Sequence, residues 1–408
     1  MARNFLIGQS GGPTAAINAS LAGALKQALN SPEICEVYGA HNGIKGVFER
    51  DFIDLRKSIK SDEDLQLLKE TPAMALGSCR FKLPDFPSPY YETILNIFRE
   101  YNIGYFLYIG GNDSMDTVKK LSAYFSSINE DIRVAGIPKT IDNDLCCTDH
   151  TPGFGSAAKY IAASVAEIAC DSSVYDDFSV TIVEIMGRNA GWLTASSALA
   201  RLTGCGAPHM IYLPETVFDP IKFVEDLKAI KQKVRHIVVA VSEGLKLADG
   251  SYAGESKQSG LTDAFGHKYL SGIGKYLEEM VKNELHCKVR SVNLNVLQRA
   301  ASHITSSTDI NEAFAAGESA VRFALSGKTG VVAVIRRVSN SPYTVDYDYC
   351  EVNKIANYVK FVPQEWIASN GYDITAEMME YLKPLILGES KRHFKFGLPE
   401  FFSLTEKV

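Results

Sequence analysis

The sequence predicts an α/β fold in which mostly parallel sheets are covered by helices. Short apolar runs alternate with amphipathic stretches along the chain, and this alternation is typical of such folds. The runs have strand length and are rich in β-branched or aromatic residues. Polar clusters follow most of them, at the ends where open α/β sheets bind their ligands. The runs are residues 5–7, 105–109, 133–137, 180–185, 237–241 and 331–335.

Composition limits the class of protein. The chain has 408 residues, of which 46% are hydrophobic and 22% charged, which is enough for two packed lobes. Its formal net charge of -6 argues against a surface that neutralises nucleic-acid phosphates or anionic lipid. Met1 is followed by a short apolar run and by no basic leader, so we expect a cytoplasmic protein without a membrane span. The eight cysteines show no Cys-x-x-Cys spacing, which favours scattered thiols over a zinc site or a disulfide framework.

The first run leads into a glycine turn at residues 10–14 (Ser-Gly-Gly-Pro-Thr). Gly11 and Gly12 allow backbone N–H groups to approach an anion closely. A helix is expected to follow, because apolar residues recur at helical spacing from Ile17 to Ala28. A single pair of glycines is equally compatible with a structural turn.

The second run leads into a similar turn at residues 110–114 (Gly-Gly-Asn-Asp-Ser), again before a helical pattern. The repetition favours a phosphate site, yet Asp113 puts a carboxylate where a phosphate would bind. The alternative is that Asp113 or Ser114 simply caps the helix.

The third run leads into residues 138–144 (Pro-Lys-Thr-Ile-Asp-Asn-Asp), which place a lysine and two carboxylates in one short segment. Phosphoryl transfer needs a base for the acceptor hydroxyl, a cation on the departing phosphate and a carboxylate for magnesium. Asp142, Lys139 and Asp144 match these three needs. For the segment in isolation, a capped turn whose charges face water is an equally good interpretation.

Later segments complete the pattern. Residues 186–191 follow the fourth run and residues 242–244 follow the fifth, so the polar clusters are expected to meet at one edge. Residues 249–259 and 339–346 are polar, with glycine or proline, and are expected to form exposed loops. A division between lobes is expected near Pro152.

Taken in order, a set of segments resembles the signature motifs of the 6-phosphofructokinase family over about residues 5 to 390: 110–114, 138–144, 186–188, 242–244 and 297–299. The resemblance implies two Rossmann-like lobes with the active site in the cleft between them. Residues 1–152 would bind the donor pyrophosphate, residues 153–297 the sugar phosphate, and residues 298–408 would cross back between the lobes and add an extension. It also implies a magnesium-dependent transfer of a phosphoryl group to the 1-hydroxyl of fructose 6-phosphate, by a homodimer or homotetramer.

The resemblance assigns roles on the sugar side residue by residue. Asp142 matches the general base that takes the proton from the sugar hydroxyl. The other implied sugar contacts are Thr140, Met186, Gly187, Arg188, Glu243, Arg290 and Arg299, the last two arginines on the 6-phosphate. Guanidinium groups suit a phosphate because they bind it through two parallel hydrogen bonds. The implied catalytic residues are Asp142, Lys139, Asp113, Thr140 and Arg188.

The implied donor site contains Gly11, Gly12, Arg80, Gly111, Asp113 and Lys139. Members of the family that use ATP have glycine at the positions of Asp113 and Lys139, whereas members that use inorganic pyrophosphate resemble this chain at both. The Asp113 carboxylate would occupy the space of the nucleotide's α-phosphate. Two such charges ~4 Å apart in an effective dielectric of ~20 repel by ~4 kcal/mol, or roughly 10³ in affinity. Lys139 would supply positive charge to pyrophosphate.

Departures from the family pattern bear on the metal and on the subunits. Asn112 stands where ATP-using members have a magnesium-binding aspartate, so Asn112 and Asp144 are the expected metal ligands, helped by water and pyrophosphate. Ser179 stands where many members have an arginine that reaches in from a neighbouring subunit, and Val296 replaces a polar residue that usually contacts the sugar phosphate. These two departures leave sharing of the site between subunits open. Two alternative functions stay open, an ATP-dependent enzyme of the same fold and a catalytically silent regulatory subunit. The extension after about residue 330 resembles longer pyrophosphate-using members and indicates no separate chemistry.

Overall fold

A computed structural model describes residues 2–254 and 272–408 of the chain. The first sheet contains seven strands in the order β11-β10-β5-β4-β1-β2-β3. The strands from β10 to β2 run parallel to their neighbours, and β3 and β11 are antiparallel at the two edges. Their bounds are β1 (Arg3–Gln9), β2 (Ile34–Ala40), β3 (Phe52–Asp54), β4 (Ile103–Gly110), β5 (Arg133–Pro138), β10 (Val331–Asn340) and β11 (Tyr343–Glu351).

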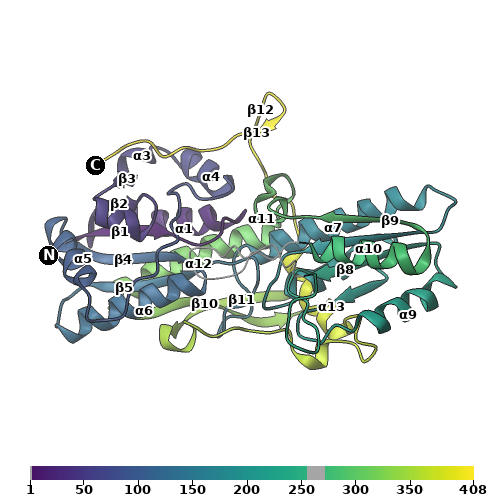
Figure 1. The fold of residues 1–408 in the computed structure, drawn as a ribbon. Coiled ribbons are helices and arrows are strands. Elements are labelled where there is room, and N and C mark those ends of the chain that lie inside the picture. The colour runs from purple at the N-terminus through teal and green to yellow at the C-terminus, as the bar shows by residue number, and fades with distance from the viewer. Residues whose placement is uncertain (1, 255–271) are drawn as a thin grey trace.

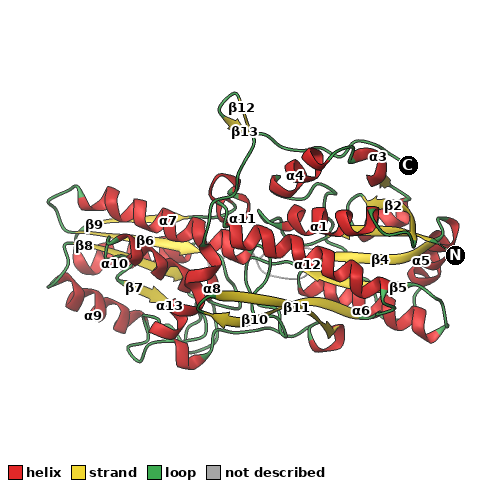
Figure 2. Ribbon diagram, turned by 180° about the vertical axis from the view of Figure 1, so that it is seen from behind, coloured by secondary structure: helices red, strands yellow, loops and turns green. Residues whose placement is uncertain are grey.

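The second sheet contains four parallel strands in the order β7-β8-β6-β9. Their bounds are β6 (Ser179–Ile185), β7 (Met210–Tyr212), β8 (His236–Ser242) and β9 (Lys288–Asn293). Figures 1 and 2 show the two sheets at opposite ends of an elongated molecule, with helices packed around each. The predicted α/β class with mostly parallel sheets is confirmed.

The first sheet is covered on both faces, which explains why its strands are continuous apolar runs. Phe5 and Ile7 pack against one pair of helices, and Leu6 between them packs against the other pair. The two helices of the first pair, one carrying Gly23 and the other Phe314, approach closely. A Cβ at Gly23 would lie 1.9 Å from the Phe314 carbonyl oxygen. The first pair is α1 (Ile17–Leu29) and α12 (Ser307–Leu325), and the second is α5 (Pro89–Glu100) and α6 (Asn112–Ser127).

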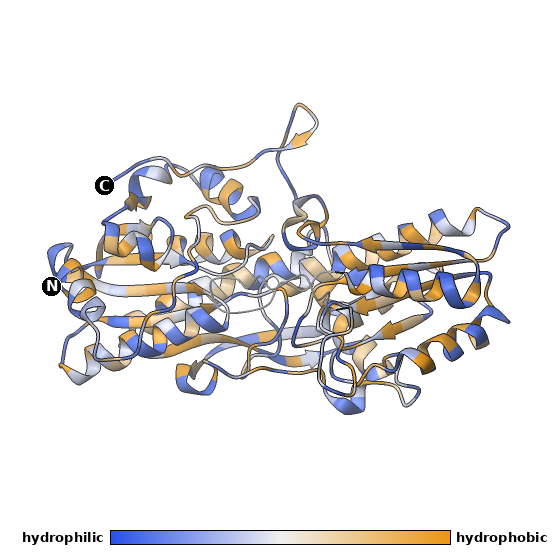
Figure 3. Ribbon diagram, in the orientation of Figure 1, coloured by the Kyte–Doolittle hydropathy of each residue, from blue (hydrophilic) through white to orange (hydrophobic). Residues whose placement is uncertain are grey.

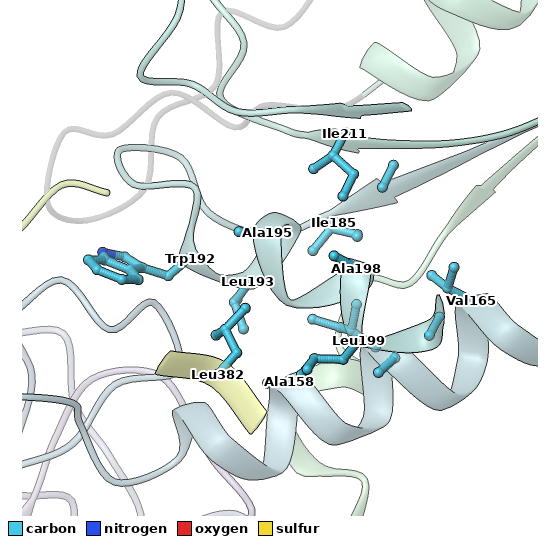
Figure 4. Packing of buried hydrophobic residues seen from close by; sticks show 14 of the residues in the cluster. Ala158, Val165, Ile185, Trp192, Leu193, Ala195, Ala198, Leu199, Ile211 and Leu382 are labelled. Carbon is cyan, nitrogen blue, oxygen red and sulfur yellow. The ribbon is translucent and has the colours of Figure 1, made fainter. Parts of the chain in front are cut away.

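The second sheet has the same layered arrangement. Its helices are α7 (Phe154–Ser173), α8 (Trp192–Ser196), α9 (Pro220–Lys231) and α10 (Ile273–Leu285). Helix α13 (Ala376–Leu382), from the C-terminal part of the chain, joins this core, and Figure 4 shows its Leu382 among residues of α7, α8 and β6. Figure 3 shows hydrophobic colours along the strands and hydrophilic colours on the outer surfaces of the helices.

Shorter elements connect these layers. They are α2 (Ile44–Glu49), α3 (Leu55–Ser58), α4 (Asp62–Glu70), α11 (Leu297–Ala300), η1 (Ser197–Thr203), η2 (Ser302–Ile304), η3 (Val352–Lys354), η4 (Gln364–Trp366), η5 (Lys383–Ile386), β12 (Phe394–Lys395) and β13 (Leu398–Pro399). The C-terminal tail then returns to the first sheet, where the Asp54 amide donates a hydrogen bond to the Glu406 carbonyl at 2.8 Å. The first sheet therefore combines segments that are far apart in the sequence, whereas the four strands of the second sheet follow one another in the chain (Figure 1).

Most of the predicted elements are confirmed. The predicted strands lie within β1, β4, β5, β6, β8 and β10, and α1 and α6 follow the two glycine turns. The loop predicted at residues 339–346 is wrong, because β10 runs to Asn340, β11 starts at Tyr343, and Ser341 and Pro342 form the turn between them. The alternating pattern from Tyr343 onward is a strand signal that the proline obscured.

Two further expectations concern boundaries. Of the loop predicted at residues 249–259, residues 249–254 form an irregular turn region, and the remainder lies outside the described residues. The lobe boundaries at residues 152 and 297 stay a prediction. Within the described ranges, no helix has the length and apolar character that a membrane crossing requires.

Candidate active site

The carboxyl ends of β1, β4, β5, β6 and β8 lead into one pocket of about 550 Å³. In the first sheet, β2 and β4 lie on opposite sides of β1, so this edge is the switch point where open α/β sheets bind ligands. The pocket brings together residues from each of the predicted polar clusters. The predicted site residues that line it are Gly11, Gly12, Arg80, Gly111, Asn112, Asp113, Lys139, Thr140, Asp142, Asp144, Met186, Arg188, Glu243 and Arg299.

Lys139 holds the backbone of the first glycine turn through a hydrogen bond. Its ammonium donates a hydrogen bond to the Gly12 carbonyl at 2.7 Å, and a Cβ at Gly11 would lie only 3.3 Å from the same nitrogen. Gly11 also has a φ of +84°, which disfavours other residues there. Burial lowers the pKa of Lys139 to about 8, although Asp142 nearby acts in the opposite direction. An anion in the pocket would favour the charged lysine.

Helix α6 starts inside the pocket. Its N-cap is Gly111, and no side chain caps it, so the alternative in which Asp113 or Ser114 serves as the cap is not supported. Asp113 is exposed in the first turn and lines the pocket. A carboxylate at a helix N-terminus is electrostatically favoured there, and it would repel a phosphate group in the same place.

Asn112 has a different environment from the one that a metal ligand needs. Its Oδ1 accepts a hydrogen bond from the Asn357 amide at 2.5 Å, and its Nδ2 donates to the Tyr358 carbonyl at 2.6 Å. Both ends of the side-chain amide therefore hold the backbone of a distant segment. This arrangement does not support the prediction that Asn112 binds magnesium.

The loop that carries Asp142 and Asp144 is held from several sides. The Thr140 hydroxyl oxygen accepts a hydrogen bond from the Asp142 amide at 3.1 Å, and the Thr140 carbonyl accepts one from the Thr151 hydroxyl at 2.7 Å. Asn143, fully buried with a φ of +53°, accepts from the Thr151 amide at 3.1 Å. The turn is thus ordered by its own side chains, and both carboxylates are left at the pocket.

Three carboxyl groups in the pocket have raised pKa values. Burial, followed by repulsion from Asp144 and Glu243, raises the pKa of Asp142, and the cations Lys139 and Arg188 oppose the rise. Burial also raises the pKa values of Asp144 and Glu243. A carboxyl group whose pKa lies nearer to neutrality is suited to accept a proton from a hydroxyl group.

The segment that follows β6, which is predicted to contact the sugar, is held by its neighbours. Gly187 has a φ of +128°, and a Cβ there would lie 2.6 Å from the Ala190 carbonyl oxygen. The Glu243 carboxylate accepts from the Gly187 amide at 3.4 Å, and the Gln298 side chain accepts from the Met186 amide at 3.2 Å. Gly187 therefore shapes the backbone next to the pocket without lining it.

The arginines of the pocket point to an anionic ligand. Among the described residues, the Nε atoms of Arg188 and Arg299 are buried without a hydrogen-bond partner. Burial, together with the nearby guanidinium of Arg80, lowers the pKa of Arg299. A phosphate group would satisfy these donors and offset the repulsion between the cations.

Arg290 does not reach the pocket of this chain. It pairs in register with Thr181 in the middle of β6, rather than at the carboxyl end, and its guanidinium bonds Asp171 at 3.0 Å on the surface. The predicted contact of Arg290 with the sugar phosphate is therefore not supported within one chain.

Several residues of the pocket were missed by sequence reasoning. Ser10, Pro13, Thr14, Ser114, Ile141 and Asn189 are neighbours of predicted residues, and Lys82 follows Arg80 by two positions. Adjacency alone could have suggested these. Asn357 and Val359 come from the C-terminal part of the chain, and no local pattern marks them.

Comparisons with known proteins agree with this geometry. The phosphofructokinase family matches residues 4–324. The chain is 40% identical over 408 residues to the pyrophosphate--fructose 6-phosphate 1-phosphotransferase of Halomonas elongata, covering 99% of this chain and 96% of the relative. It is 41% identical over 411 residues to a protein of the same name from Methylococcus capsulatus, covering 99% of this chain and 96% of the relative.

A solved structure shows the same fold along the whole chain. The crystal structure of a pyrophosphate-dependent phosphofructokinase from Nitrosospira multiformis matches with a TM-score of 0.90 at 38% identity, covering 100% of this chain and 98% of that one. Both the sequence and the fold therefore assign the chain to one family. The chain belongs to the phosphofructokinase family.

Proposed function

We propose that this chain reversibly transfers a phosphoryl group from inorganic pyrophosphate to the 1-hydroxyl of fructose 6-phosphate, giving fructose 1,6-bisphosphate and phosphate. The observation that carries the proposal is the presence of Asp113 and buried Lys139 in the lining of one pocket that also holds Asp142. The names of the two relatives support it, because both alignments span nearly the whole chain.

Asp142 is proposed as the general base. As the sugar 1-oxygen forms its bond to the transferring phosphorus, Asp142 takes the hydroxyl proton, and the bond from phosphorus to the bridging oxygen of pyrophosphate breaks. Phosphate leaves with the electron pair of that bond. The raised pKa of Asp142 matches this role, because a base works best near the operating pH.

The remaining roles follow from charge. Lys139 and Arg80 stabilise the negative charge on the donor phosphates, including the departing phosphate. Arg299 holds the 6-phosphate of the sugar, and Arg188, Met186, Thr140 and Glu243 bind and orient the sugar. Asp113 disfavours nucleotide binding because its carboxylate occupies the space of the α-phosphate and repels the negative charge of that group.

Magnesium fits the pocket as a partner of the donor phosphates. Within the described ranges, no group of three or more His, Cys, Asp or Glu side chains could hold a metal ion. Magnesium in phosphoryl-transfer sites is usually bound by one or two carboxylates with substrate phosphates and water. We propose Asp144 as the protein ligand, and Asn112, whose side-chain amide bonds the backbone of Asn357 and Tyr358, stays a prediction. When bound, the ion neutralises charge on the phosphates.

The partners of the chain follow from the same site. Pyrophosphate and fructose 6-phosphate are its proposed ligands. The homodimer or homotetramer and the cytoplasmic location stay predictions, and the net charge of -6 continues to argue against nucleic acid as a partner.

The proposal is tested by initial rates with pyrophosphate and with ATP at fixed fructose 6-phosphate and magnesium. We expect turnover with pyrophosphate and a kcat/KM with ATP that is roughly 10³-fold lower, from the repulsion at Asp113. Asp142→Asn should lower kcat by about 10²- to 10⁴-fold, because the base is lost. Asp131→Asn, at a surface ion pair, is the matched control. Comparable use of ATP would contradict the donor assignment, and turnover with neither donor would support the silent subunit.

A further inference from the structure

Residues 357–362, which we call the cross-strap, link the first sheet to the second. They leave the first sheet after β11 and η3 and lead to η4 and α13 in the second core. The sequence of this part of the chain indicates no separate chemistry. The cross-strap bonds to three parts of the chain around the pocket: the start of α6, which we call the donor wall; the loop that carries Asp142 and Asp144; and the segment of residues 186–192 after β6, which we call the sugar wall.

The first contact is with the donor wall. Asn112 at the start of α6 exchanges two hydrogen bonds with the backbone of Asn357 and Tyr358. The Asn357 side chain donates to Asp116 in the next turn of α6, at 3.0 Å. The start of α6, which carries Asp113, is thereby tied to the cross-strap.

The second contact is with the loop of the proposed base. The Lys360 amide donates to the Asp144 carbonyl at 2.8 Å. The Lys360 ammonium donates to three oxygens of the same loop region, on Asn143 (3.3 Å), Thr148 (3.2 Å) and Asp149 (2.7 Å). One cation therefore gathers three acceptors behind the two pocket carboxylates. An apolar side chain at this position would take the donor from the Thr148 carbonyl, whereas Asn143 and Asp149 would keep their bonds from Thr151 and Tyr381.

The third contact is with the sugar wall. The Trp192 indole donates to the Lys360 carbonyl at 2.9 Å, and the Lys360 ammonium lies 5.0 Å from the Trp192 ring centroid. One oxygen of Glu215 accepts from both the Val362 amide (3.0 Å) and the Gly191 amide (2.8 Å). Figure 4 shows Trp192 with the buried hydrophobic residues of the second core, so the cross-strap is bonded to a residue of that core.

We propose that the cross-strap is a positioning element of the active site, in which Lys360 sets the place of the loop bearing Asp142 and Asp144 relative to the donor and sugar walls. Lys360 does not touch the substrates in this assignment, because it does not line the pocket. Its effect passes through the loop that it holds. The inference rests on the proposed function, and small displacements of reacting groups are known to cost large factors in rate.

The first test compares Lys360→Met with Lys354→Met, using the full chain, pyrophosphate and fructose 6-phosphate. Lys354 is an exposed lysine in η3 that pairs with Glu351. We expect Lys360→Met to lower kcat about 10- to 100-fold and to change both KM values by less than about threefold, because the substrate-binding arginines are untouched. Lys354→Met should match the wild type.

The kcat is measured per folded protein, with the folded fraction taken from circular dichroism. A purely structural role for Lys360 would lower the melting temperature without lowering this kcat, and that result would overturn the proposal. The wild type is assayed in parallel. An inactive wild type would overturn the proposed function, whereas an active wild type with an equally active Lys360→Met would overturn only the role of the cross-strap.

A second pair of variants decides the matter if Lys360→Met does not fold. Glu215→Gln keeps the oxygen that accepts from Gly191 and Val362, whereas Glu215→Ala removes it. We expect Glu215→Ala to lower kcat at least fivefold and Glu215→Gln to retain more than half of it. Equal kcat values in the two variants would overturn the proposal.

Discussion

At the scale of single residues, the proposed donor site contains a buried positive side chain and an exposed negative one. Lys139 is 2% exposed and bonds the Gly12 carbonyl, whereas Asp113 is exposed in the first turn of α6. Burial weakens the preference of Lys139 for its charged form, as the lowered pKa shows, and a bound anion restores that preference. We propose that Asp113 limits which anion can do so.

The proposed roles of Asp113 and Lys139 in selecting the phosphoryl donor predict how a double variant behaves. Asp113→Gly combined with Lys139→Gly should raise kcat/KM for ATP by at least about 10-fold, because the repulsion with the α-phosphate is removed. Turnover with pyrophosphate should fall by about 10²-fold or more, because the buried cation is lost. Both values come from initial rates with each donor.

The matched control for the double variant is Asp85→Gly. Asp85 is a surface aspartate that pairs with Lys120, and it does not line the pocket. This variant should keep the donor preference of the wild type. Unchanged use of ATP in the double variant would show that Asp113 and Lys139 do not close the nucleotide site.

At the scale of elements, the close approach of α1 and α12 orders the helical layer behind the glycine turn. Gly23 is the residue that permits the approach, since its missing side chain leaves room for the Phe314 carbonyl. The Lys26 ammonium also lies over the Phe314 ring, 5.3 Å from its centroid. The position of α1, and with it the turn at Gly11 and Gly12, depends on this packing.

Gly23→Ala is therefore expected to destabilise the protein. Alanine is favoured over glycine inside a helix by ~1 kcal/mol, so a net loss would report the clash with Phe314. We expect a loss of about 1 to 3 kcal/mol in the free energy of unfolding. Thermal or urea unfolding measures it. Gln27→Ala on the same helix should change stability by less than about 0.5 kcal/mol, and a stabilised Gly23→Ala would refute the close contact.

At the scale of the whole molecule, a buried ionic network joins distant segments beside the cross-strap. His150 bonds Asp149 at 2.8 Å and Glu312 of α12 at 2.5 Å. Burial opposes the charge on His150, but these two carboxylates outweigh it and raise the pKa of His150 to about 9. The other charged or titratable groups around it are Asp309, Arg337, Tyr343, Lys360 and Tyr381.

The network predicts how stability depends on pH. Because the folded pKa of His150 lies above its ordinary value of 6.5, its stabilisation is complete below about pH 6.5 and is lost as the pH rises through about 9. The shift corresponds to about 3 kcal/mol. The melting temperature of the wild type should therefore fall between pH 7 and pH 9.5, and that of His150→Gln should fall less. His303→Gln, at an exposed histidine, should keep the wild-type slope.

What the sequence could predict depends on the range of the interactions. The strands and the glycine turns were predictable because each is set by neighbours within a few residues. Their meeting at one edge followed from the carboxyl ends of parallel strands. The hydrogen bond between Asn112 and the Asn357 amide was not predictable, because it joins segments that are 245 positions apart in the sequence. The mid-strand place of Arg290 was not predictable for a similar reason, since only the strand register shows it, and its contact with the sugar phosphate stays a prediction.

The position of β10 in the first sheet bears on how the chain folds during its synthesis. Strand β5 ends at Pro138, and its outer neighbour β10 starts at Val331. A ribosome that adds ~5–20 residues per second needs roughly 10–40 s to make the intervening segment. Throughout that interval β5 is an open, apolar edge that can pair with a foreign strand. The nascent chain should therefore be most prone to aggregate, and most in need of a chaperone, while the second sheet is being made.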